Sequence, residues 1–331
     1  MAKRKLLSRF QRFWFSSRRR DSAKGFTLLE LLVTTAIAGG IVSGLLFIVV
    51  QLMSVDQRES AQSETQREMQ LALNYISTEM RDAVYVYTGT TLAAQAGRGN
   101  GQSLMEFLPA NLTTTESAPI IAFWKQQPFP DKVKTDCATG TPPASATCAN
   151  GSSYALVVYS LSTSNPNGTW KGKARITRYA LTEFNSQGTA TTGYVNPGVN
   201  NNFETWPYGT NQTGLANLQV SRPDNATPAA LVDFVDNTTA GAAGVCPNAT
   251  TTGVTYDISP KTGVRSFYAC VNDRQKPGVP VGQALGDSQD VLIYLRGNVA
   301  GRPGASLSSL FLPTLEARVL SRGVLGRVPT N

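Results

Sequence analysis

Few side chains of this 331-residue chain have the type and spacing that catalysis or metal binding requires. The sequence contains no His, which excludes a Ser-His-Asp triad, a Cys-His pair, and zinc or haem held by imidazole. Tyr, Asp and Glu occur in the chain, but the sequence does not identify a pair of carboxylates placed for acid–base catalysis. We therefore expect no enzymatic activity and no bound cofactor.

The four Cys residues form two local pairs, Cys137 with Cys148 and Cys246 with Cys270. Disulfides are the default if this part of the chain is exported. Three pairings are possible, and we favour the local one because both pairs flank loops. A zinc site is the competing hypothesis, but it is disfavoured because the chain has no close Cys-x-x-Cys pair and no His.

Two weaker binding hypotheses concern Asp and Trp side chains. Calcium prefers carboxylate oxygens, although the segment from Asp287 to Asp290 reads more simply as a polar turn before a strand. The Asp residues considered are Asp131, Asp136, Asp233, Asp236, Asp287 and Asp290. Exposed Trp side chains would suit a glycan. Trp124, Trp170 and Trp206 are the candidates, with packing in the core or on a sheet as the favoured alternative.

The formal net charge of +8 is concentrated at one end of the chain. Residues 1–25 hold nine Lys or Arg and one Asp, and the remaining 306 residues hold 21 basic and 21 acidic side chains. A DNA-binding face on the body of the protein is therefore not implied, because such faces depend on Lys and Arg that neutralise phosphates.

An apolar run follows this basic segment over residues 26–53, and Glu30 is its one ionisable side chain. A helix of that length spans about 42 Å, enough to cross a hydrocarbon core of about 30 Å. Residues 51–68 carry two basic and four acidic side chains, so the positive-inside rule places the N-terminus in the cytoplasm. A carboxylate at a helix centre costs about 2.5 to 3.5 kcal/mol on insertion, so Glu30 is either an edge charge or has a cationic partner.

The segment from Lys24 to Leu32, which reads KGFTLLELL, resembles the processing site of type IV pilins and type II secretion pseudopilins. The resemblance implies that a prepilin peptidase cuts after Gly25, the last leader residue, and methylates the new amino group of Phe26. It also implies that Glu30 pairs with the N-terminal amine of a neighbouring subunit, which lowers the cost of both buried charges. The helix lacks the proline that many pilins carry, and Gly39, Gly40 and Gly44 are candidates for a flexible or closely packed stretch.

The resemblance extends to a kind of subunit and a setting. The helix around Gln66–Ile76 and the long body resemble minor subunits of the J/W type, and among them the pseudopilins of cyanobacterial hormogonium polysaccharide secretion. This implies a single-pass protein of the inner membrane that enters a filament and supports polysaccharide secretion and gliding motility. The implied partners are the prepilin peptidase, other pilin or pseudopilin subunits, the inner-membrane assembly platform and an exported polysaccharide, with no nucleic acid.

Two other functions remain open at this point. One is a binding module on a pilus, for DNA uptake or adhesion. The other is an uncleaved single-pass anchor that presents an enzyme.

The helical pattern continues beyond the membrane segment as an amphipathic stalk over residues 54–84. Apolar side chains recur at helical spacing along one face; they are Met69, Leu73, Ile76, Met80 and Val84. We expect one continuous helix of about 55 to 60 residues whose second half packs on a globular head. A coiled coil is the alternative, but the stripe covers barely two heptads.

Residues 85–331 change to a composition rich in Thr, Asn, Gly, Ala and Ser, which predicts an extracytoplasmic, β-rich head. We expect an α+β, pilin-like fold in which the long helix packs on an antiparallel sheet. The predicted strands are 104–108, 119–124, 154–161, 174–181, 231–235, 264–271, 291–296 and 315–320. Residues 185–215 and 236–260 are expected to be surface loops, and the tail from Arg322 is expected to fray.

Overall fold

The structure is a computed structural model. It describes residues 25–93, 101–200, 203–211, 214–238, 245–247, 255–272, 289–305 and 312–321. The chain divides into two compact units, Met1–Val55 and Asp56–Asn331, and each is considered by itself. The predicted tail beyond Arg322 lies outside the described residues.

A single helix, α1 (Leu28–Arg81), accounts for 54 residues and belongs to both units. The expected continuity of the membrane segment and the stalk is confirmed. The predicted end of the stalk at Val84 is wrong, because Ala83–Val86 forms strand β1 and pairs with β2. Pairing with a neighbouring strand outweighs the helical spacing of that one residue.

The remaining elements belong to the second unit and form an α+β head. Its helices are α2 (Gly89–Ala93), α3 (Asp131–Thr139) and α4 (Pro197–Asn200), with the 3₁₀ helices η1 (Leu104–Phe107), η2 (Ala110–Leu112) and η3 (Cys148–Asn150). The strands are β1, β2 (Ser117–Pro128), β3 (Ser152–Ser162), β4 (Ala174–Leu181), β5 (Tyr208–Asn211), β6 (Gly214–Asn217), β7 (Ala229–Val235), β8 (Tyr256–Ser259), β9 (Phe267–Asn272), β10 (Asp290–Arg296) and β11 (Thr314–Leu320).

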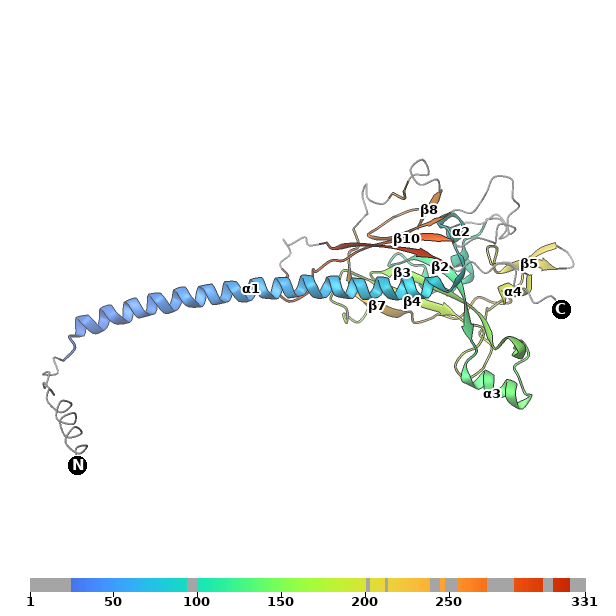
Figure 1. The fold of residues 1–331 in the computed structure, drawn as a ribbon, viewed down its shortest axis with the longest axis horizontal. Helices are drawn as coiled ribbons and strands as arrows, with labels where there is room; N and C mark the ends of the chain where they lie inside the picture. The colour runs from blue at the N-terminus through green and yellow to red at the C-terminus, as the bar shows by residue number, and fades with distance from the viewer. Residues whose placement is uncertain are drawn as a thin grey trace, which may run out of the picture. The chain divides into compact units, whose positions relative to one another are not determined.

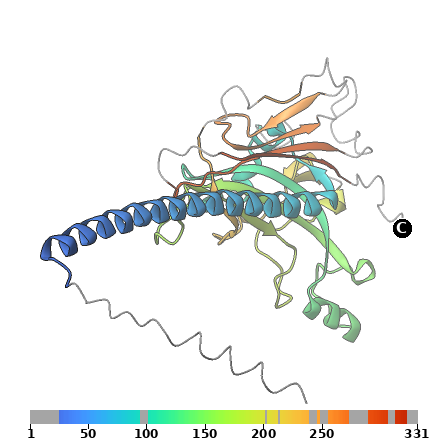
Figure 2. The same cartoon turned by 60° about the vertical axis from the view of Figure 1, so that its left-hand side comes forward.

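The described strands form three antiparallel sheets. A five-stranded sheet has the order β1-β2-β3-β4-β7, a four-stranded sheet has the order β11-β10-β9-β8, and β5 and β6 form a hairpin. A bridge between Val235 and Gly297 joins the end of β7 to the end of β10. Figures 1 and 2 show the two larger sheets alongside the C-terminal half of α1.

The main core lies where one stripe of α1 meets both larger sheets. Met69, Ile76 and Met80 of the helix are fully buried there, as the sequence stripe predicts. They pack with Phe123 of β2 and Val291 of β10, among other apolar side chains of both sheets. The removal of these apolar side chains from water is the main force that holds the helix to the head.

A second core covers the opposite face of the five-stranded sheet, because side chains alternate along a strand. Ile121 and Phe123 point to α1, whereas Ala122 and Trp124 point to the second core. Trp124 and Trp206 are fully buried there with ring centroids 5.5 Å apart. These two side chains therefore serve packing, and the glycan hypothesis does not apply to them.

Seven of the eight predicted strands are confirmed within a few residues, and one is wrong. Residues 104–108 form the 3₁₀ helix η1, because Ser103 and Glu106 make a capping box that closes a helical turn. Strands β1, β5, β6 and β8 were not predicted. Strands β5 and β8 lie in segments that we expected to be loops, and β6 begins in one of them.

Candidate functional site

The residues predicted to serve processing and assembly lie just before α1 and in its first turn. Gly25, Phe26 and Thr27 are exposed and precede the helix. Thr27 caps the helix: the backbone N–H of Glu30 donates to its Oγ1 at 3.3 Å, and the N–H of Leu31 donates to its carbonyl at 3.2 Å. Sequence analysis missed this cap, although the spacing Thr27-x-x-Glu30 is the pattern of a capping box.

Glu30 lies in the first turn of α1 and is exposed in the isolated chain. An acid is favourable at this place because the N-terminal end of a helix carries a partial positive charge. Its place suits a role local to its own helix, and its exposure is compatible with the predicted pairing with a neighbouring subunit. Experiments on this residue must separate the two.

Residues 28–55, the rest of the described part of the first unit, form one helix whose apolar surface is exposed. Every large apolar side chain from Phe26 to Val55 is between 46% and 84% exposed. Thr34 and Thr35 donate their hydroxyl groups to carbonyls one turn earlier at 2.9 Å, so both are satisfied without water. The helix is long and apolar enough to cross a membrane, and only lipid or other apolar helices suit such a surface.

Three glycines lie in this exposed helix at Gly39, Gly40 and Gly44. A Cβ added at any of them would meet nothing within 4 Å, so no contact with the described residues requires a glycine. The two predicted roles of these glycines are a flexible stretch and the close approach of another helix. Neither role involves a contact with the described residues.

A buried charge network fixes the C-terminal end of α1 on the five-stranded sheet. Glu79 is 9% exposed and accepts bonds from Lys125 of β2 at 2.7 Å and from Nε of Arg178 of β4 at 2.9 Å. The hydroxyl of Tyr159 on β3 also donates to it. Burial raises the pKa of Glu79, but these hydrogen bonds outweigh burial and lower the pKa to about 2. The carboxylate therefore stays charged and ties α1 to three strands.

A second contact holds α1 near the start of the second unit, through the collar, which we define as residues Gly297–Ala305. Arg302 is 8% exposed and bonds to Glu64 at 2.6 Å and also to Glu68. Its guanidinium lies over the ring of Phe234, 4.1 Å from the centroid. Phe234 has a positive φ of 59°, which is rare for a bulky residue. Through Arg302, the collar contacts the face of α1 that carries Glu64 and Glu68.

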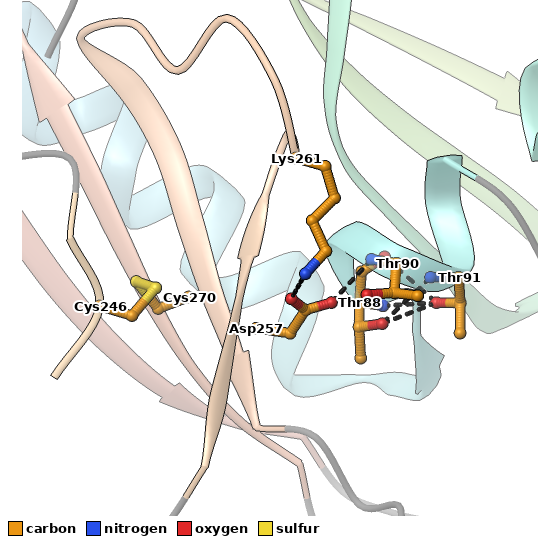
Figure 3. A network of polar contacts seen from close by, with 7 residues as sticks. All are labelled: Thr88, Thr90, Thr91, Cys246, Asp257, Lys261 and Cys270. Carbon is orange, nitrogen blue, oxygen red and sulfur yellow. Dashed lines mark hydrogen bonds and ion pairs between the residues drawn. A yellow bond between two sulfur atoms is a disulfide. The ribbon is translucent and has the colours of Figure 1, made fainter. Parts of the chain in front are cut away.

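Both predicted disulfides are present with the local pairing, Cys137 with Cys148 and Cys246 with Cys270. The first closes the excursion between β2 and β3 that carries α3. The second ties residues 245–247 to β9, and Figure 3 shows it near the contact between β8 and α2. In that contact the N–H of Thr90 donates to Asp257 at 2.7 Å.

The calcium hypothesis finds no support among the described residues, where no group of three or more metal-ligating side chains occurs. Asp236 pairs with Arg296 at 2.8 Å, and one oxygen of Asp233 accepts two backbone N–H groups. Asp131, Asp136 and Asp290 bond to Lys134, Lys132 and Arg318, and Asp287 lies outside the described residues.

Searches of protein-family models, of curated proteins and of solved structures find no match to this chain.

Proposed function

We propose that this chain is a minor pilin or pseudopilin, cleaved after Gly25 by a prepilin peptidase and assembled into a filament through the exposed half of α1. The observation that carries the proposal is the first turn of α1. The Gly25–Phe26 bond lies just outside the helix, and an acid follows within the first turn at Glu30. An uncovered apolar helix continues from there.

The physical argument for assembly rests on pairing two costly groups. Cleavage after Gly25 creates a new amino group at Phe26, at the edge of an apolar segment. An amine and a carboxylate in a low-dielectric bundle are each costly alone and less costly together. Assembly into a filament would bring the Phe26 amine of one subunit to Glu30 of the next and cover the apolar surface of both helices.

The orientation of the chain in the membrane is inferred from the distribution of charge on the two sides of the apolar run. The basic segment 1–25 would stay in the cytoplasm and the head would lie outside the inner membrane. The partners are then the prepilin peptidase, other pilin or pseudopilin subunits and the inner-membrane assembly platform. A role in polysaccharide secretion and gliding motility rests on the sequence resemblance alone.

The proposal is tested by cleavage of the full chain in membranes that contain a prepilin peptidase. The native chain should lose residues 1–25, and Gly25→Val should block the loss. Ala23→Val is the matched control, because it also replaces a small residue with Val, two positions earlier. The chain with Ala23→Val should still be cleaved. A native chain that keeps residues 1–25 in the presence of an active peptidase would refute the proposal.

A further inference from the structure

We propose that the loop between β3 and β4, residues 163–173, docks the head on the anionic surface of the membrane that α1 enters. In this assignment Trp170 lies among the lipid headgroups, and Lys171 and Lys173 bind lipid phosphates. The inference rests on α1 crossing a bilayer. It depends neither on cleavage after Gly25 nor on filament assembly.

The contacts within the second unit place this loop close to the start of that unit, at Gln57. The collar reaches α1 at Gln57, because a Cβ added at Gly304 would lie 2.6 Å from the Cβ of Gln57. Gln57 is four residues past Met53, or about 6 Å along a helix. The loop touches the collar in turn, since a Cβ added at Gly301 would lie 2.1 Å from the carbonyl oxygen of Lys171.

The composition of the loop suits an anionic lipid surface. Residues 163–173 contain Lys171 and Lys173, which are both exposed, and no acid; the next cation, Arg175, is buried and donates to the carbonyl of Ser164. Lys or Arg near such a surface contributes about 1 kcal/mol per residue, and Trp is enriched at membrane interfaces because one end of its ring is apolar and the other is polar. Trp170 is 37% exposed, whereas Trp124 and Trp206 are fully buried.

The loop is held rigidly in a form that presents these side chains. The amide of Asn165 makes two bonds to the backbone of Trp170, at 2.9 and 3.2 Å. Asp233 accepts the N–H groups of Lys171 and Gly172 at 3.1 and 2.9 Å. The guanidinium of Arg175 lies over the Trp170 ring, 4.9 Å from its centroid. A preorganised loop loses little conformational entropy when it binds.

The head also provides a control pair of lysines far from this loop, each of which is paired with an Asp of its own helix. Lys132 and Lys134 lie on α3, before the start of β3, and their side chains are 55% and 52% exposed. The loop follows the end of β3, whose 11 residues extend over about 33 Å. If any surface lysine could attract the head to anionic lipid, substitution of either pair would weaken docking. If the loop docks, only substitution of Lys171 and Lys173 would weaken it.

The test uses the full chain reconstituted in phosphatidylcholine vesicles with or without phosphatidylglycerol. Trp fluorescence is quenched with a phosphatidylcholine that carries a nitroxide on its headgroup. A Trp14→Phe background removes the leader tryptophan, and Trp170→Phe identifies the signal of Trp170. Alkaline extraction first confirms insertion of α1, so that failed insertion is distinguished from failed docking.

We expect quenching of Trp170 in phosphatidylglycerol vesicles at low salt, and its loss at high salt because salt screens exposed charges. Replacing both loop lysines, as Lys171→Gln with Lys173→Gln, should lower the docking equilibrium roughly 25-fold. Lys132→Gln with Lys134→Gln should leave it unchanged. Equal quenching in both vesicle types, or equal effects of the two lysine pairs, would overturn the proposal. Dextran, a polysaccharide, tests the alternative that the loop binds a glycan. A Trp170 signal that responds to added dextran and not to phosphatidylglycerol would also overturn the proposal.

Discussion

Glu79 offers the sharpest test of how the head holds α1. The substitution Glu79→Gln keeps the size and one acceptor oxygen but removes the negative charge. Lys125 and Arg178 then face a neutral amide, although their side chains are only 19% and 23% exposed. Removing one partner of a buried ion pair is costly because the other charge remains poorly solvated.

The magnitude follows from the pKa of Glu79. Burial alone would raise this pKa from its ordinary 4.5, but the bonds from Arg178, Lys125 and Tyr159 lower it to about 2. The difference corresponds to about 3 kcal/mol of folding free energy. Because the pKa in the folded protein is depressed, this stabilisation is present above pH 4.5 and is lost as the pH falls toward 2.

The assay is equilibrium unfolding in urea, with the protein in mild detergent micelles. The fluorescence of buried Trp124 and Trp206 reports on the head. At pH 7, Glu79→Gln should lower the free energy of unfolding by about 3 kcal/mol, whereas Glu59→Gln, on an exposed part of the same helix, should change it by less than about 0.5 kcal/mol. The gap between the native protein and Glu79→Gln should close between pH 4.5 and the lower limit of the assay.

The reasoning about Glu79 would be refuted by either of two results. One is a Glu79→Gln protein as stable as the native protein at pH 7. The other is a difference in stability between the two proteins that stays constant as the pH falls. Other carboxylates also have lowered pKa values, such as Asp236, Asp257 and Asp290. They titrate in both proteins and cancel from the difference, so its pH dependence reports on Glu79.

Two further predictions concern the first turn of α1 and the disulfides. Glu30→Gln keeps the residue type of a capping box and Glu30→Ala does not; both should insert into membranes, and both should fail to enter filaments, as measured by immunoblots of sheared filaments. Normal assembly of Glu30→Gln would mean that the cap, and not the charge, is what matters. Peptide mapping without reductant should find Cys137 linked to Cys148 and Cys246 linked to Cys270, and replacing Cys246 and Cys270 with Ser should lower the free energy of unfolding by about 3 kcal/mol. Peptides that join the two pairs in another way would contradict this arrangement.

The parts of the fold that sequence predicted depend on short-range pattern. The apolar run predicted the first half of α1, which is apolar on all sides, and the stripe at Met69, Leu73, Ile76 and Met80 predicted the second half, which buries one face on the head. Strand β4 was predicted at its exact bounds, 174–181. These segments carry their signal within a window of about ten residues.

The contacts that fix α1 could not be predicted in this way. Glu79 meets Tyr159 and Arg178 across 80 and 99 residues of sequence, and Arg302 meets Glu68 across 234. Only the folded topology brings such partners together. The Ser103–Glu106 capping box and the Thr27 cap were different, because their signals were local and were missed.

The central claim is that the chain is processed at Gly25 and then assembled. The most direct measurement is the intact mass of the protein extracted from membranes of cells with an active prepilin peptidase, with fragmentation of its N-terminal peptide. The account predicts a chain that begins at Phe26 with one methyl group on its amine. A chain that still begins with residues 1–25, or one cleaved at another bond, would contradict it.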